Sequence, residues 1–212
     1  MLSIIQAAGW PIWPLLVCSV LAVALVIERF WRLRTLRVLG RDVLADISAQ
    51  IQHGRPSAEV LSAWQAQSDM GAVLVSSLYA LERHPTCSEV DLRNTVETAG
   101  RLAAQRMEQY LSALATIASA APLLGLLGTV VGMIEIFAAQ SQSGGGNPVQ
   151  MAQGISIALY NTAFGLVVAV PALIAWRYFR SQVDGLILAI ETDAESLVRH
   201  LLAQREQGGD RP

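Results

Sequence analysis

The sequence predicts an all-α, polytopic membrane protein with three transmembrane helices and further helices that extend into the cytoplasm. Three observations predict this class. Hydrophobic residues make up 53% and charged residues 15% of the 212 residues, which is too apolar for an ordinary soluble domain. Three apolar stretches of about 20 residues are long enough for helices that cross a hydrocarbon core of roughly 30 Å. The cations, all arginine, are confined to 29–106 and 177–211.

The first transmembrane helix is expected within residues 1–31, after a short N-terminus outside the membrane. Trp10 and Trp13 stand at one end of its apolar run and Trp31 at the other, as is typical of side chains at membrane interfaces. A cleaved signal peptide would carry cations before its apolar region, whereas here the arginines follow it. We therefore expect a retained helix that runs from outside to inside.

Residues 32–110 are expected to form a cytoplasmic helical loop. Apolar residues recur at helical spacing from Leu36 to Ile51, and Gly54 and Pro56 would end that helix. Shorter helices are expected at 57–67 and 70–83.

After these helices, Thr86 and Glu89 fit a capping box that would begin a long helix. No turn signal follows, so the sequence predicts one unbroken helix over 87–139, bent at Pro122.

The second and third transmembrane helices are expected at 111–139 and 152–176, joined by an outer turn at 140–151. A cytoplasmic C-terminal helix and tail at 177–212 would follow, because apolar residues recur there from Val183 to Leu201 at spacings of three and four. Cations stay on the cytoplasmic side of membranes. Both arginine blocks are therefore expected inside, and the N-terminus and the outer turn outside.

Small residues follow one side of each helix of this hairpin. On the second helix they are Ser119, Pro122, Gly125, Thr129 and Gly132, with Gly128 close beside them, and on the third Gly154, Ala158, Thr162, Gly165, Ala169 and Ala172. Pro122 and Pro171 are expected to kink the two helices. Small residues let helix backbones approach closely, which favours a packing seam. The same faces could instead line a pore or a sleeve around another helix, and the pattern leaves both interpretations open.

Glu135 is the only charged residue between Glu108 and Arg177. A carboxylate in a membrane span is costly unless it faces protein or water, so it predicts an ion pathway; the alternative is that it reaches out to the headgroups. The three histidines lack the spacing of metal ligands, and no nucleophile or nucleotide motif is apparent. We therefore predict no enzyme activity, no metal, no cofactor and no nucleic-acid partner.

The hairpin sequences APLLGLLGTVVGMIEIF and GISIALYNTAFGLVVAVPALIAW resemble the MotA/TolQ/ExbB proton-channel family, and most of all its ExbB branch. The resemblance implies a homopentamer in a bacterial inner membrane. Its central pore would be lined by the second and third helices and would hold the single-span helices of an ExbD-like partner. It also implies proton-driven action on a TonB-like protein that energises outer-membrane transporters, with Thr129 and Thr162 facing the pore.

One departure from the family concerns Ile157, because many members have a glutamate at this position of the third helix. Counted outward from Thr162 and Thr129, Ile157 and Glu135 both lie roughly 8 to 9 Å further out at 1.5 Å per residue. We hypothesise that the charge has changed helix at constant depth. Two other functions remain open: a TolQ-like subunit of the Tol-Pal envelope system, and a three-span scaffold that conducts no ions.

Overall fold

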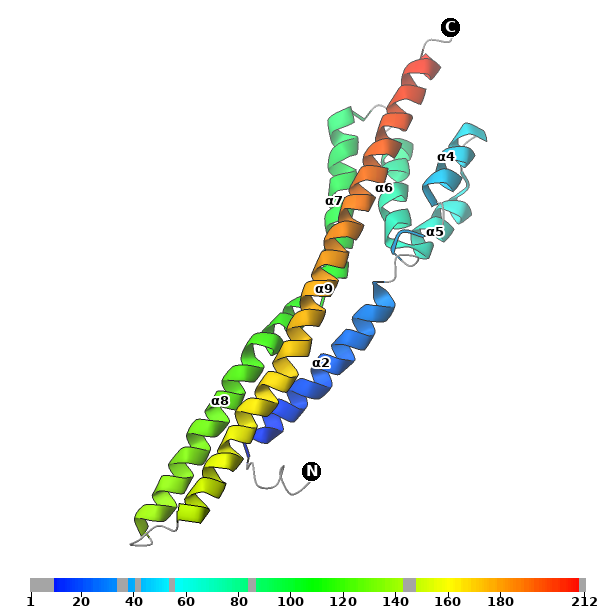
Figure 1. Cartoon of the computed structure of the whole chain (residues 1–212). Helices are drawn as coiled ribbons and strands as arrows, with labels where there is room; N and C mark the ends of the chain where they lie inside the picture. Colours follow the sequence, from blue (N-terminus) through cyan, green and yellow to red (C-terminus); the bar gives the residue numbers. More distant parts are fainter. Residues whose placement is uncertain are drawn as a thin grey trace. The chain divides into compact units, whose positions relative to one another are not determined.

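The structure is a computed structural model that describes residues 10–33, 38–40, 43–53, 56–83, 87–142 and 148–209. Within these ranges the regular secondary structure is helical, as predicted. The helices are α2 (Ile12–Arg32), α4 (Val43–His53), α5 (Ala58–Gln67), α6 (Asp69–Arg83), α7 (Glu89–Glu108), α8 (Leu111–Gln142) and α9 (Pro148–Gly209) (Figure 1).

The chain divides into two compact units. The hairpin unit comprises Met1–Arg29 and Tyr110–Tyr178, and the arginine-rich unit comprises Phe30–Gln109 and Phe179–Pro212. The long helix α9 contributes to both. Each unit is described by itself.

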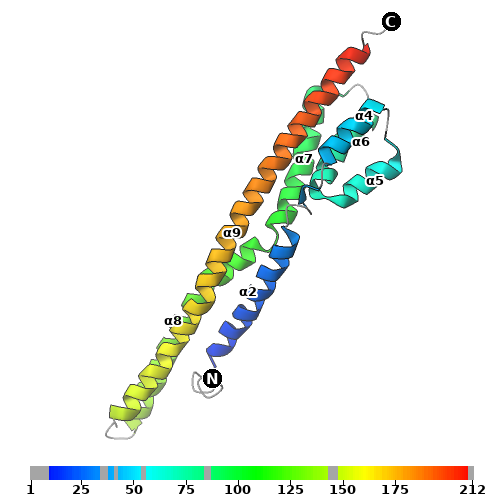
Figure 2. The ribbon, with the colours of Figure 1, turned by 45° about the vertical axis from the view of Figure 1, so that its right-hand side comes forward.

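In the hairpin unit, α8 and the first part of α9 run side by side in opposite directions (Figures 1 and 2). Helix α2 packs on both through Leu15, which is buried with Ala121 and Ala169. The outer surfaces of the three helices are apolar: Trp13, Leu123 and Val167 are 64%, 66% and 67% exposed. Three helices of the described chain are long and apolar enough to cross a membrane. Their exposed apolar side chains are those that lipid would cover.

The predicted unbroken helix over 87–139 is wrong. Helix α7 ends at Glu108, α8 begins at Leu111, and Tyr110 between them has a φ of 66°. This left-handed conformation costs a residue other than glycine about 1–3 kcal/mol, so neighbouring groups must stabilise it. Pro122 does not end the helix, since α8 continues through it to Gln142.

Arg29 supplies the contact that holds Tyr110. Its side chain is fully buried, and its guanidinium carbon lies 5.3 Å from the centroid of the Tyr110 ring. Its Nη2 also donates to Oε1 of Glu28 at 2.8 Å. A cation over an aromatic face contributes about 0.5–2 kcal/mol depending on burial, which is comparable with the cost of the backbone conformation.

The arginine-rich unit is built around α6, where Val73, Leu74 and Val75 are at most 1% exposed. Its α7 lies beside the C-terminal part of α9 (Figures 1 and 2). The apolar repeat predicted between Val183 and Leu201 is largely buried, and both residues are among its buried members. Ion pairs link α7 to α9 as well: Arg93 to Glu195 at 3.0 Å and Glu108 to Arg180 at 2.7 Å.

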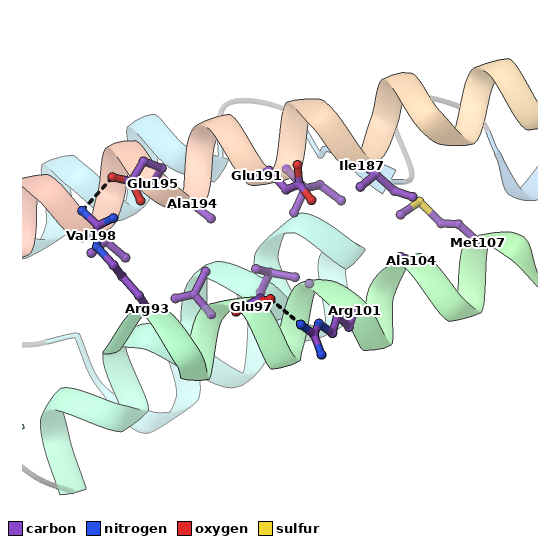
Figure 3. Close-up of a pocket in the computed structure, with 14 residues that line it drawn as sticks. Arg93, Glu97, Arg101, Ala104, Met107, Ile187, Glu191, Ala194, Glu195 and Val198 are labelled. Atoms are coloured by element: carbon purple, nitrogen blue, oxygen red, sulfur yellow. Dashed lines mark hydrogen bonds and ion pairs between the residues drawn. The ribbon is translucent and has the colours of Figure 1, made fainter. Parts of the chain in front are cut away.

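A cavity of about 430 Å³ lies between α7 and this part of α9 (Figure 3). Its walls are largely apolar, and the Arg93–Glu195 and Arg101–Glu97 ion pairs stand among its charged lining residues (Figure 3). Gly100 helps to create it, because a Cβ atom added there would meet no atom within 4 Å.

One predicted helix start is wrong by two residues. Helix α7 begins after Ser88, whose hydroxyl accepts from the Asp91 N–H at 3.1 Å while the Asp91 carboxylate accepts from the Ser88 N–H at 3.2 Å. The capping box therefore lies two residues beyond the predicted pair, of which Thr86 is outside the described residues. The helix start predicted near Leu36 lies outside the described residues; among them, helix α4 begins at Val43, and Gly40, with a φ of 75°, precedes it.

Candidate functional site

The backbones of α8 and α9 are in direct contact at two glycines. A Cβ atom added at Gly125 would lie 2.8 Å from the carbonyl oxygen of Asn161, and one added at Gly165 would lie 2.6 Å from that of Ala121. Real Cβ atoms do not approach backbone atoms this closely. The small-residue faces therefore meet each other within one chain at this level of the hairpin.

Thr162 and Thr129 differ in their contacts. The Thr162 hydroxyl donates across the seam to the carbonyl oxygen of Gly125 at 3.2 Å. The Thr129 hydroxyl donates to Leu126 in its own helix at 2.7 Å. Both side chains are half-buried in the single chain. The bond from Thr162 favours a packing role for that residue, and the pore-lining role of both threonines remains a prediction.

The other residues expected in packing and kinks lie along the same two helices. A Cβ atom added at Gly132 would lie 3.0 Å from Cβ of Ala158, which is 2% exposed. Pro122 is half-buried inside α8, and Pro171 is exposed inside α9, which continues through it.

Asn161 is a buried polar residue that the sequence reasoning missed. It is 2% exposed, and its side chain occupies the space beside Gly128, where an added Cβ atom would lie 2.7 Å from Asn161 Cβ. An amide within an apolar span, one residue before a threonine, was the available signal.

A cavity of about 310 Å³ opens between α8 and α9 on one side of this asparagine. Its lining comes from α8, α9 and the residue before α2: Pro11, Gly128, Val131, Gly132, Glu135, Ile136, Ala139, Gly154, Ile157, Ala158 and Asn161. Glu135 and Asn161 are the lining residues with polar side chains. The cavity thus combines one carboxylate and one amide with otherwise apolar or small groups.

Glu135 and Ile157, assigned to the same depth from sequence, both line this cavity from opposite helices. Glu135 is exposed and Ile157 is half-buried. A glutamate at 157 would therefore face the same space as Glu135. Among the described residues, no cluster of histidine, cysteine, aspartate and glutamate could hold a metal ion.

Comparison with known proteins identifies the family. A family model described as the MotA/TolQ/ExbB proton channel family matches residues 65–192, more than half of the chain. The chain belongs to this family. The match includes all of α8 and the part of α9 that lines the cavity. With three helices able to cross a membrane, this member is a multi-pass membrane protein.

Three curated relatives show how much of the chain the similarity covers. The chain is 31% identical over 205 residues to the biopolymer transport protein ExbB-like 1 of Synechocystis, covering 94% of this chain and 79% of that one. It is 30% identical to the biopolymer transport protein exbB1 of Vibrio cholerae, over 79% of this chain and 74% of that one. The Tol-Pal system protein TolQ of Pseudomonas aeruginosa is 35% identical, over 50% and 48% of the two chains.

Proposed function

We propose that this chain is the ExbB-like, pore-forming subunit of a proton-driven complex in a bacterial inner membrane. With an ExbD-like single-span protein it would use the proton motive force to act on a TonB-like protein and energise outer-membrane transport. The observation that carries the proposal is the family match across a hairpin whose cavity is lined by a carboxylate, Glu135, and a buried amide, Asn161. Polar groups at such depth mark ion pathways in membrane proteins.

The proposed arrangement is a homopentamer with α8 and α9 around a central pore. The N-terminus and the turn between α8 and α9 would face the periplasm, and the arginine-rich unit the cytoplasm. The arginine distribution supports this orientation, because 107–176 contains no cation while both flanking regions contain several.

An ExbB role is preferred to a TolQ role because two ExbB-named relatives match over 94% and 79% of the chain, against 50% for the TolQ protein. Co-purification separates the two roles. The tagged chain, extracted in mild detergent from its own organism, should retain an ExbD-like protein. Retention of a TolR-like protein alone would assign it to the Tol-Pal envelope system.

One observation favours a scaffold that conducts no ions. The Thr162 hydroxyl, which was predicted to line the pore, donates a hydrogen bond to the other helix of the hairpin and so contributes to packing. Complementation distinguishes it. Expression of this chain together with its ExbD-like partner, in a strain that lacks its own ExbB and TolQ proteins, should restore uptake that depends on the proton motive force. A stable membrane complex that restores no uptake would contradict the proposal.

A further inference from the structure

We propose that the cavity between α8 and α9 is a water-filled vestibule within each subunit, open at Glu135 and closed at Asn161, which admits protons from the outer side. The inference rests on the proposed proton-conducting function. It adds an entry for protons that lies inside one hairpin and a positioning residue, Asn161, at its inner end.

The two polar groups lie at different depths of the cavity, whose lining continues from Glu135 outward to Ala139. Glu135 lies seven residues beyond Gly128 on α8, which places both on one face, about 10 Å apart along the axis. Asn161 on α9 fills the space beside Gly128. Glu135 is exposed whereas Asn161 is 2% exposed, so the first marks the mouth and the second the inner end.

The cavity has the size and the polar groups that water requires. Its volume is about 310 Å³, against the roughly 10–15 Å³ needed for one water molecule. Cavities lined only by apolar groups stay dry, but an amide can donate two and accept two hydrogen bonds, and a carboxylate accepts several. Water between these two groups would hydrate the carboxylate and hydrogen-bond to the amide, so that protons from the outer side could reach Glu135.

The glycine contact closes the inner end. One turn beyond Gly128, the two backbones approach so closely that a Cβ atom at Gly125 would lie 2.8 to 3.2 Å from three backbone atoms of α9. No water fits through such a contact. Gly128 itself is required because a side chain there would displace Asn161.

Cysteine labelling tests the vestibule independently of proton transport. In a Cys18→Ala, Cys87→Ser background, Ile157→Cys places a thiol in the cavity, and Leu159→Cys, 59% exposed on another face of α9, is the matched control. The thiolate, which forms only in water, attacks the sulfur of a methanethiosulfonate reagent and displaces methanesulfinate as the mixed disulfide forms. In the complex with its ExbD-like partner, labelling from the periplasmic side should be at least about tenfold faster at position 157. Equal rates, or no labelling at 157, would overturn the vestibule.

Two further variants test the polar ends. Glu135→Gln should slow the cationic reagent at position 157 about fivefold and leave the anionic reagent unslowed, because a unit charge a few ångströms away in water attracts a cation by about that factor. Asn161→Leu, similar in size and apolar, should reduce labelling by both reagents and also proton flux. Rates unchanged in both variants would contradict the assigned ends.

The outcomes separate the vestibule from the proposed function. If Ile157→Cys is labelled but the reconstituted complex passes no protons, the vestibule stands and the proposed function fails. If protons pass and the thiol stays unlabelled, the function stands and the vestibule fails.

Discussion

The same substitution should have opposite effects on stability at two glycines of this chain. Gly100 lies in α7 beside open space, so Gly100→Ala adds a methyl group without a clash. Alanine in a helix interior is favoured over glycine by about 0.5–1 kcal/mol. Gly125→Ala makes the same gain in α8 but places Cβ 2.8 Å from the Asn161 carbonyl oxygen. The two helices must then separate, at a cost of about 1–3 kcal/mol for overpacking.

The separation also weakens the bond from Thr162 to Gly125, which contributes about 0.5–1.5 kcal/mol. We therefore expect Gly100→Ala to stabilise by about 0.5–1 kcal/mol and Gly125→Ala to destabilise by about 1–3 kcal/mol. At roughly 2–4 °C per kcal/mol for a chain of this length, thermal unfolding in mild detergent, followed by circular dichroism, resolves the two signs. A rise in Tm for Gly125→Ala would refute the close contact between α8 and α9.

Three further predictions concern the helix break, the threonines and the assembly. A double-mutant cycle with Arg29→Gln and Tyr110→Leu should give a coupling energy of about 0.5–2 kcal/mol in thermal unfolding, and additive effects would exclude the cation–π contact. Thr162→Val should lower stability by about 0.5–1.5 kcal/mol and Thr129→Val by less, since only the first loses an interhelical bond. Loss of uptake in the Thr129→Val variant with normal assembly would support a pore-lining role, and full uptake in both variants would favour a packing seam. Native mass spectrometry in mild detergent should give a pentamer, and a monomer as the sole species would contradict the ring.

The helical class and the existence of three spans could be predicted because lipid imposes simple rules. A span must be apolar, about 20 residues long and helical, and each of these properties is visible in the sequence. The buried face from Val183 to Leu201 could also be predicted, because apolar residues at helical spacing indicate a buried face whichever element packs against it.

The break before α8 could not be predicted from the same rules. A residue in the left-handed conformation is usually glycine or asparagine, whereas here the residue in that conformation is Tyr110. Its conformation is held by Arg29, a residue 81 positions earlier by number, so the cause is tertiary. The cap was predicted at Thr86 and lies at Ser88 for a local reason. Each of these residues has a hydroxyl group and an acidic residue three positions later, so the sequence does not show which of the two begins the helix.

The candidate site was partly visible in the sequence. Glu135 stood out as an isolated charge, and counting along two helices assigned Ile157 the same depth. The burial of Asn161 depends on which residue of α8 faces it. The facing residue is set by how the two helices pack, which the sequence pattern of neither helix shows by itself. The glycine opposite it, Gly128, had been assigned only to packing.

Proton flux through the reconstituted complex tests the central claim most directly. Liposomes that contain this chain and its ExbD-like partner, with a pH-sensitive dye inside, should acidify when a potential is applied. Glu135→Gln should slow acidification, and adding Ile157→Glu should restore it, because both positions line the same cavity. Acidification that is no faster than in liposomes holding the partner alone would contradict the assignment of this chain as a proton-conducting subunit.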